Sequence, residues 1–167
     1  KLKIGERLVS PEAIFTVSES DDDITREMQN FALKHIVNPK FAYRERPVLI
    51  NNWEGTGFDF DGEKIYEMAK TAKKVGIELF VLDDGWFGKR DNDLSGLGDW
   101  YDNEKKTGGL KILADKIRSL GMKFGLWVEP EMISEDSDLY RAHPEWAMKI
   151  PNVTPLRRRS QLCIDIC

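Results

Sequence analysis

No apolar run in this sequence approaches the roughly 20 residues of a membrane-spanning helix. The chain also does not open with the basic and then apolar stretch of a secretion signal. An excess of positive charge is lacking too: 25 lysine and arginine residues stand against 29 aspartate and glutamate residues, for a net charge of −4. Because nucleic-acid-binding domains usually carry basic stripes, we expect neither a nucleic-acid partner nor a membrane.

Cysteine and histidine are scarce. The only cysteines are Cys163 and Cys167, and the only histidines are His35 and His143. Two cysteines so close in the chain do not form a disulfide framework. Neither histidine is near them in sequence, so the residues of a zinc site are not brought together. We therefore expect a cytoplasmic protein, in a reducing compartment, without a bound metal.

The glycine pattern of nucleotide-binding folds is also missing. A dinucleotide-binding loop needs the spacing Gly-x-Gly-x-x-Gly after a strand. Gly55 and Gly57 begin this spacing, but Phe60 stands where the third glycine belongs, and no Gly-Lys-Ser/Thr motif occurs. We predict that the protein uses no cofactor.

From Pro47 onward, short apolar runs alternate with amphipathic segments. The runs predict strands at 48–51, 77–82 and 122–128, and a fourth extended run at 161–167. Two apolar stripes at helical spacing predict helices, each followed by a capping glycine. The stripes are Ile65, Met68, Ala69, Ala72 and Val75 before Gly76, and Leu110, Leu113, Ala114, Ile117 and Leu120 before Gly121. Asp61 is the expected cap of the first helix, and a shorter helix is expected from Asp136 to about His143, stopped by Pro144.

This order of elements predicts an α/β fold with a parallel sheet. Near-continuous apolar strands are typical of strands buried on both faces, and the helices would be the crossovers between them. An open doubly wound sheet and a (β/α)8 TIM barrel both fit. Polar and aromatic residues gather where the strands end, as in barrel enzymes, but a whole barrel needs about 250 residues. We predict that residues 47–167 are the first half of a barrel, with its first three to four strands.

The first 46 residues have a different pattern. Residues 13–18 read as a strand, and Asp21, Asp22 and Asp23 as the acidic start of a helix that ends near Val37. Residues 38–46 read as a linker rich in lysine and arginine. We interpret this region as a linking helix and a strand from another domain. Because the chain starts at Lys1 rather than Met, we expect its N-terminus to be a cut end of something longer.

Adjacent acids and tryptophans at the strand ends are the candidate functional residues. Asp83 and Asp84 follow the second predicted strand directly, and paired carboxylates can accept hydrogen bonds from neighbouring sugar hydroxyls. The alternative is that one caps a turn and the other pairs with a cation. Trp53 and Trp127 end the neighbouring strands, and an indole offers a flat surface to the C–H face of a sugar. Such tryptophans are otherwise structural anchors.

Two further groups of charged residues are candidates for the site. Glu129 and Glu131 share one face of an extended segment and could be acid and base, but salt bridges at the rim are favoured. Of the run 157–159, Arg159 is nearest to the last extended run and is the one expected to enter the site.

Long stretches of this sequence resemble bacterial α-galactosidases of glycoside hydrolase family 36. The resemblance covers about residues 44–167, and its motifs occur in order and at matching spacing. They are Arg46-Pro47-Val48-Leu49-Ile50-Asn51-Asn52-Trp53-Glu54, Leu79-Phe80-Val81-Leu82-Asp83-Asp84-Gly85-Trp86-Phe87-Gly88, Gly121-Met122-Lys123-Phe124-Gly125-Leu126-Trp127-Val128-Glu129-Pro130-Glu131, Ser137-Asp138-Leu139-Tyr140-Arg141 and His143-Pro144-Glu145-Trp146.

The resemblance implies a retaining hydrolase of terminal α-galactosides on a (β/α)8 barrel. It implies that residues 1–46 are the end of an N-terminal β-sandwich domain and a linking helix. It also assigns galactose binding to Trp53, Asp83, Asp84, Trp127 and Arg159. We expect a galactoside substrate and a homo-oligomeric full-length protein.

The sequence also departs from the family pattern. The family's Arg-Asn-Gln segment reads Arg159-Ser160-Gln161 here, and Leu-Asp-Leu-Ser becomes Ile164-Asp165-Ile166-Cys167. The family nucleophile lies in a Lys-Trp-Asp motif, which these 167 residues do not contain. We expect the nucleophile and the acid/base beyond Cys167, and therefore an inactive isolated chain. The alternatives are an α-galactosyl transferase, an α-N-acetylgalactosaminidase relative, or a non-catalytic carbohydrate-binding module.

Overall fold

The computed structural model describes residues 3–149, 153 and 160–165. The chain divides into two compact units, Lys1–Arg46 and Pro47–Cys167. Within the described residues, no helix is both long and apolar enough to cross a membrane.

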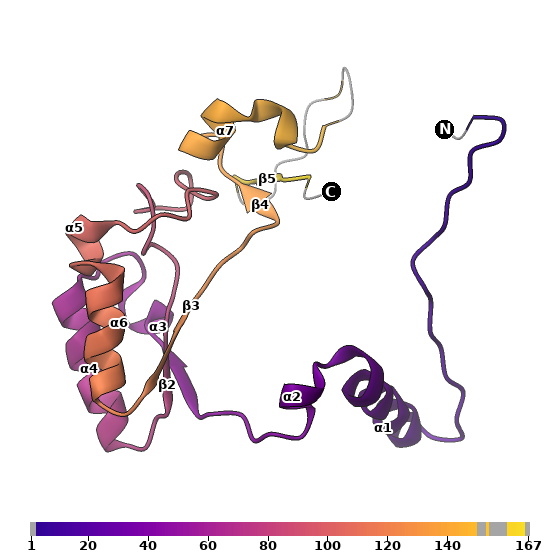
Figure 1. The fold of residues 1–167 in the computed structure, drawn as a ribbon, viewed down its shortest axis with the longest axis horizontal. Helices are drawn as coiled ribbons and strands as arrows, with labels where there is room; N and C mark the ends of the chain where they lie inside the picture. Colours follow the sequence, from indigo (N-terminus) through magenta and orange to yellow (C-terminus); the bar gives the residue numbers. More distant parts are fainter. Residues whose placement is uncertain (1–2, 150–152, 154–159, 166–167) are drawn as a thin grey trace. The chain divides into compact units, whose positions relative to one another are not determined.

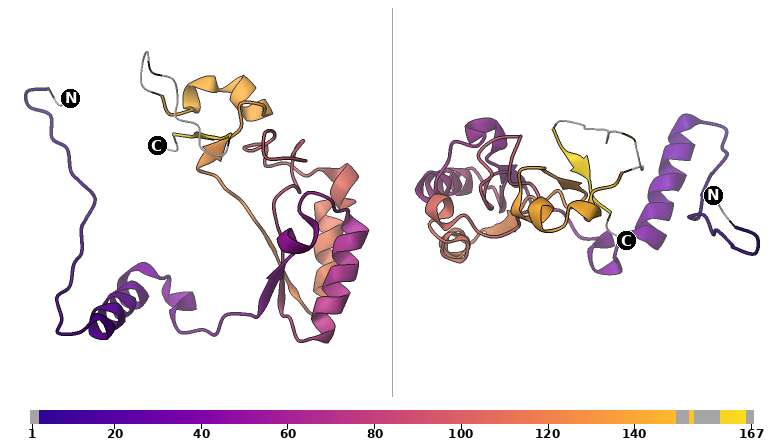
Figure 2. Two further views of the ribbon diagram at one scale, coloured as in Figure 1. Left: turned by 180° about the vertical axis from the view of Figure 1, so that it is seen from behind. Right: turned by 90° about the horizontal axis from the view of Figure 1, so that it is seen from above.

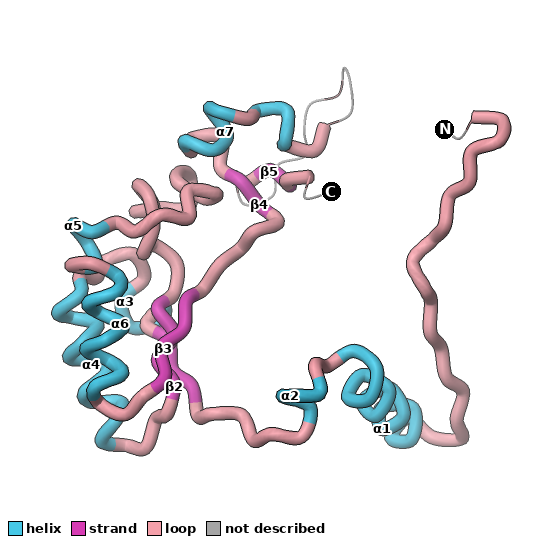
Figure 3. The backbone as a smooth tube through the Cα atoms, viewed as in Figure 1, coloured by secondary structure: helices cyan, strands magenta, loops and turns pink. Residues whose placement is uncertain are grey.

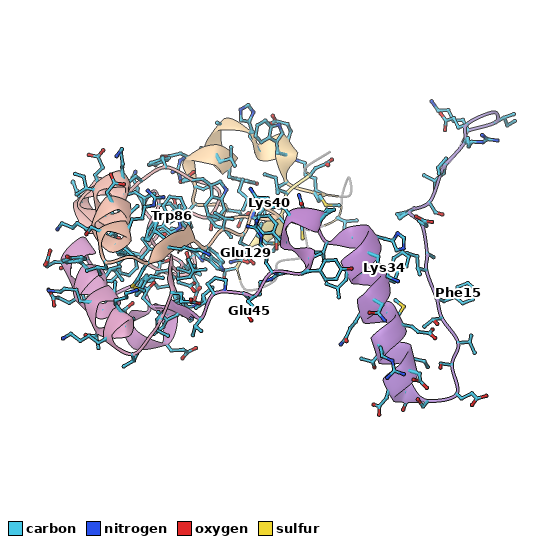
Figure 4. The ribbon with its side chains drawn as sticks, turned by 60° about the horizontal axis from the view of Figure 1, so that its bottom comes forward. Phe15, Lys34, Lys40, Glu45, Trp86 and Glu129 are labelled. Atoms are coloured by element: carbon cyan, nitrogen blue, oxygen red, sulfur yellow. The ribbon has the colours of Figure 1, made fainter. Side chains whose placement is uncertain are left out.

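The first unit consists of an extended stretch followed by helices. The helices are α1 (Asp21–Phe31), a π-helical turn η1 (Ala32–Ile36) and α2 (Pro39–Ala42). Helix α1 starts at the three acids as predicted: the Ser20 side chain caps it by accepting from the backbone N–H of Asp23, and the acids fill the first turn. The predicted strand at 13–18 is wrong: this stretch pairs with no strand among the described residues, and Phe15 is 88% exposed (Figure 4).

A three-stranded parallel sheet forms the centre of the second unit. Its order is β1 (Leu49–Asn51), β2 (Leu79–Leu82), β3 (Lys123–Leu126), with β2 in the middle (Figure 1). The register pairs Leu49 with Leu79 and Phe80 with Phe124. The three predicted strands are therefore confirmed, each shorter than its apolar run.

Two helices cover one face of this sheet. Helix α4 (Gly62–Lys74) and helix α6 (Leu110–Ser119) lie side by side, as the views of Figures 1 and 2 agree. Asp61 caps α4 as predicted, since its carboxylate accepts from the backbone N–H of Lys64 at 2.8 Å. Gly76 and Gly121 follow the two helices with φ of 89° and 75°, values that suit glycine.

The core lies between the helices and the sheet. The residues buried there include Ile65, Ala69, Ala72, Phe80, Leu82, Leu113 and Ile117. On the opposite face of the sheet, Leu49 is 52% exposed, while Leu79 and Val81 are half-buried. The prediction that the strands are buried on both faces is thus wrong for this chain, because α4 and α6 cover only one face in the part that the structure describes.

The last extended run does not join the parallel sheet. Strand β5 (Leu162–Cys163) pairs antiparallel with β4 (Met132–Ile133), which the sequence analysis did not predict (Figure 3). Ile133 and Leu162 are both buried in this pair, and they form a small second core with Ala147. The predicted short helix is confirmed as α7 (Asp138–Ala142), and a 3₁₀ turn, η2 (Pro144–Trp146), follows it.

Two further short helices interrupt segments that read as loops. They are α3 (Trp53–Thr56), directly after β1, and α5 (Glu104–Thr107), before α6.

Candidate functional site

The carboxyl ends of the three parallel strands open into one pocket. Its volume is about 290 Å³, and its lining residues are Trp53, Asp83, Asp84, Arg90, Asp93, Trp127, Glu129 and Gln161. Four of the five residues predicted to bind a ligand therefore lie together. The fifth, Arg159, lies outside the described residues. Four carboxylates and one guanidinium give this lining a negative charge.

Two hydrogen bonds hold Asp83, one to its backbone and one to its carboxylate. The backbone N–H of Asp83 donates to Asn52 Oδ1 at 2.8 Å, and Asp83 Oδ1 accepts from the backbone N–H of Asp84 at 2.8 Å. Asn52 is completely buried, and its Nδ2 donates to Thr56 Oγ1 at 2.9 Å. Asn52 thereby ties the end of β1 to the end of β2, and this residue was not predicted to take part in the site.

The Asp84 carboxylate forms a buried ion pair with Arg90. Arg90 Nε donates to Asp84 Oδ1 at 3.0 Å, and Nη2 donates to Oδ2 at 2.8 Å. Asp84 is 6% exposed and Arg90 is 1% exposed. The alternative prediction for the two acids is that one contacts the local backbone and the other pairs with a cation. Both contacts are present: Asp83 accepts from a backbone N–H, and Asp84 pairs with Arg90. Both acids nevertheless line the pocket.

Aromatic residues form the walls around these acids. Trp53 begins α3 and makes an edge-to-face contact with Phe58 at 5.1 Å between ring centroids. Trp127 follows β3 and lies nearly parallel to Phe87 at 6.4 Å. Both tryptophans are half-buried, so part of each indole remains accessible to a ligand.

Trp86 and Glu129, labelled in Figure 4, both follow strands, but only Glu129 lines the pocket. Trp86 is buried, and its Nε1 donates to the carbonyl oxygen of Trp127 at 2.9 Å, which joins the ends of β2 and β3. Glu129 lines the pocket, whereas Glu131 is exposed and does not.

The loop after β2 is held against α7. Asp99 is 4% exposed, and its two carboxylate oxygens accept from the backbone N–H groups of Asp138 and Leu139, both at 2.9 Å. The Tyr101 hydroxyl donates to Asp138 Oδ2 at 2.7 Å, and this bond is the main reason that the pKa of Tyr101 rises to about 12. Arg141, and then Tyr101, lower the pKa of Asp138.

The sequence pattern of the family described as Melibiase matches residues 8–167. This chain belongs to the melibiase family.

The relatives of this melibiase chain carry α-galactosidase names. It is 49% identical over 166 residues to the bifunctional alpha-galactosidase/sucrose kinase AgaSK of Mediterraneibacter gnavus, covering 98% of this chain and 18% of the relative. It is 46% identical to the alpha-galactosidase AgaA of Geobacillus stearothermophilus, covering 98% of this chain and 23% of AgaA. The chain thus spans about a fifth of the length of these curated relatives.

Solved structures extend the similarity to the fold. The GH36 alpha-galactosidase AgaB of Geobacillus stearothermophilus matches with a TM-score of 0.80 and 51% identity, over 85% of this chain and 20% of AgaB. The alpha-galactosidase of Lactobacillus brevis matches with a TM-score of 0.82 and 49% identity, over 89% of this chain and 20% of that enzyme. The resemblance to bacterial family 36 α-galactosidases is therefore confirmed.

Three residues that line the melibiase pocket were not predicted from the sequence to bind a ligand: Arg90, Asp93 and Gln161. Arg90 stands six residues after Asp84 in a loop without hydrophobic periodicity, so no pattern marks it. Its one available signal is that it stands two residues after the quoted motif that ends at Gly88. Among the described residues, no group of three or more histidine, cysteine, aspartate or glutamate side chains is arranged to hold a metal ion.

Proposed function

We propose that this pocket is part of the galactose-binding subsite of a retaining α-galactosidase. The observation that carries the proposal is the gathering of Trp53, Asp83, Asp84 and Trp127 around one pocket at the carboxyl ends of parallel strands. Barrel enzymes place their active sites at this end of the sheet. The second unit would then be the first part of a (β/α)8 barrel, and the first unit the end of a β-sandwich domain with its linking helix.

The chemistry of the lining suits a neutral sugar ring. Asp83 and Asp84 supply carboxylate oxygens that accept hydrogen bonds from hydroxyl groups, and Trp53 and Trp127 supply flat apolar surface for C–H groups. The volume of about 290 Å³ is at the lower end of the about 300–1,000 Å³ of small-molecule sites, which suits one monosaccharide ring.

Complexes of similar proteins support a terminal α-galactoside as the substrate. Variants of AgaA from Geobacillus stearothermophilus, 49% identical to this chain, have been solved with stachyose and with raffinose. The α-galactosidase TtGalA of Thermus thermophilus, 25% identical, has been solved with stachyose. Both sugars end in an α-linked galactose, which would occupy the pocket described above. The full-length protein is proposed to be cytoplasmic and homo-oligomeric.

Asp83 and Asp84 are proposed to bind the sugar rather than to break the glycosidic bond. Retaining hydrolysis needs two carboxyl groups about 5–5.5 Å apart on opposite sides of that bond. Asp83 and Asp84 are adjacent in the chain, and Arg90 already occupies both oxygens of Asp84. The nucleophile and the acid/base are therefore proposed to come from residues beyond Cys167, and the 167-residue chain alone is proposed to be inactive.

Calorimetry with methyl α-galactoside tests the binding role. In the intact protein, Asp83→Asn and Trp127→Ala are each expected to weaken binding by about tenfold, since each removes a direct contact. Asp115→Asn is the matched control, because Asp115 is exposed on α6. Equal affinities in all four proteins would contradict the proposal.

Turnover of an aryl α-galactoside tests the catalytic role. The 167-residue chain is expected to show none, and the intact protein to show turnover. Hydrolysis by the isolated chain that is lost in Asp83→Ala would instead make Asp83 a catalytic residue. Galactose binding without any hydrolysis by the intact protein would favour a carbohydrate-binding module.

A further inference from the structure

Among the described residues that line the pocket, Arg90 is the only basic one, and it is buried. It is 1% exposed, and its guanidinium contacts several groups of its own loop. Besides the three hydrogen bonds to Asp84, its Nη1 donates to the carbonyl oxygen of Ser95 at 3.0 Å. Its Nη2 also lies 3.7 Å from Asp93 Oδ1. These contacts hold the guanidinium in one place.

The ion pair engages one edge of the Asp84 carboxylate. Nε and Nη2 together reach both carboxylate oxygens, the fork-like geometry that only arginine offers. A carboxylate oxygen can accept two hydrogen bonds. Oδ2 accepts from both Nε and Nη2, whereas Oδ1 accepts only from Nε, so Oδ1 keeps acceptor capacity on the side away from Arg90. Within the part of the chain that the structure describes, Arg90 is the sole donor to this carboxylate.

The loop is shaped around Arg90 before any ligand arrives. Gly96 has a φ of 77°, and a Cβ atom there would lie 2.9 Å from the backbone nitrogen of Arg90. A Cβ atom on Gly85, with a φ of 100°, would lie 3.2 Å from the backbone oxygen of Arg90. The Phe58 ring, which also contacts Trp53, lies 5.5 Å from the guanidinium carbon. Arg90 is therefore packed by its own loop and by the segment that joins α3 to α4.

We infer that Arg90 is a positioning residue for substrate specificity. It fixes the rotation of the Asp84 carboxylate so that the free acceptor site of Oδ1 faces the pocket and selects a hydroxyl group at a defined position of a neutral sugar. The identity of the sugar rests on the proposed function, but the orientation of Asp84 does not. Arg90 acts through Asp84 and forms no bond in the reaction.

Crystal structures of the intact protein test the orientation without any sugar. Arg90→Lys keeps the positive charge but loses the fork, so Asp84 is expected to rotate or to occupy two conformers. The control is Arg118→Lys on the surface of α6, where Arg118 pairs with the exposed Asp115 at 3.2 Å. An Asp84 carboxylate with the same single orientation in Arg90→Lys as in the wild type would overturn the inference.

Deoxygenated galactosides test the specificity. Affinities are measured for methyl α-galactoside and its 2-, 3-, 4- and 6-deoxy forms. In the wild type, losing a hydroxyl that Asp84 accepts is expected to weaken binding about tenfold. In Arg90→Lys that ratio is expected to fall to about twofold, while the ratios for the other positions stay unchanged. A merely structural role would instead lower every affinity by the same factor and leave all ratios intact, which would overturn the inference.

A second variant tests the inference if Arg90→Lys does not fold. The double change Asp84→Asn/Arg90→Gln removes both charges of the ion pair together, so neither is left buried without its partner, and the variant is expected to fold and to show the same loss of discrimination. Retained discrimination in the double variant would contradict the inference. If the wild type binds none of the sugars, the proposed function fails, and the crystal structures still decide whether Arg90 positions Asp84.

Discussion

At the residue scale, two neighbouring acids that look equivalent in the sequence have different surroundings. Asp83 is oriented by Asn52 and by the next backbone N–H, whereas Asp84 is oriented by Arg90. Both carboxylates are at least nine-tenths buried and lie side by side, so their charges repel each other. The Arg90 guanidinium offsets this repulsion on one of them.

Asn52→Ala tests how much the contact between β1 and β2 stabilises the protein. The substitution removes the acceptor of the Asp83 N–H inside a buried site, so the free energy of unfolding is expected to fall by about 1–3 kcal/mol. Urea denaturation measures this loss. The control is Asn92→Ala, since Asn92 is exposed and accepts within its own turn, from the Leu94 N–H at 2.8 Å and from the Ser95 hydroxyl at 3.5 Å. Its expected cost is within about 0.5 kcal/mol, and equal losses in both variants would contradict the prediction.

At the element scale, the loop between β2 and α6 is an ordered structural element. Leu97 is completely buried in it, and Asp99 caps α7 from it. Short hydrogen bonds, such as the 2.7 Å bond from the Gly96 N–H to the Asp136 carbonyl, complete the link. Because the pocket residues Arg90 and Asp93 belong to this loop, its packing against α7 also positions the site.

Gly96→Ala and Gly76→Ala form a matched pair. Both glycines have positive φ, but a Cβ atom on Gly76 would meet nothing within 4 Å, whereas on Gly96 it would meet the Arg90 backbone. Gly76→Ala is expected to cost about 1 kcal/mol of unfolding free energy, from backbone strain alone. Gly96→Ala is expected to cost at least about 1 kcal/mol more, because the added methyl group clashes. Thermal and urea denaturation measure both, and similar losses would contradict the clash.

The link between the loop and α7 has a pH signature. The hydrogen bond to Asp138 raises the pKa of Tyr101 to about 12, whereas an unfolded tyrosine titrates near about 10. The folded state therefore keeps a proton that the unfolded state releases. This contribution to stability is full below about pH 10 and is lost as the pH rises through about 12.

Ultraviolet titration of the tyrosines checks this shift. Asp138→Asn removes the carboxylate that accepts from Tyr101, so the late-titrating tyrosine is expected to move back towards pH 10. Tyr101→Phe identifies the signal, because it should delete the late transition. A late transition that persists in Asp138→Asn would show that another cause raises the pKa.

At the scale of the whole molecule, the second unit exposes surfaces that proteins usually cover. In the described residues, β1 and β3 are the outer strands of the sheet, and the face away from α4 and α6 exposes Leu49. Open strand edges and exposed apolar faces favour association with other chains. The relatives, of which this chain covers about a fifth, offer much further sequence that could cover these surfaces.

Light scattering of the 167-residue chain tests this exposure. The chain is expected to self-associate, because two open strand edges flank a partly apolar sheet face. The alpha-galactosidase AgaA of Geobacillus stearothermophilus, of which this chain covers 23%, is the control and is expected to give one defined assembly size. A stable, monodisperse monomer of the 167-residue chain would contradict the prediction.

The local pattern of the sequence determined the elements of the second unit. Apolar runs, helical stripes, the cap at Asp61 and the glycines after each helix are signals between residues near in the chain, and each was confirmed. The same signals placed Asp83, Asp84, Trp53 and Trp127 at strand ends, so a parallel sheet was enough to bring them to one edge. The strand at 13–18 failed because a strand also needs a partner, which its own residues do not supply.

Tertiary structure alone decided the surroundings of these residues. Asn52 reaches Asp83 across 31 positions, β4 pairs with β5 across about 30, and Asp99 caps a helix 39 positions away. Hydrogen bonds over such separations follow no period in the sequence, so no local pattern could predict them. The sequence therefore determined which acids lie at the carboxyl ends of the parallel strands. The fold decided that one of them, Asp84, forms an ion pair with Arg90.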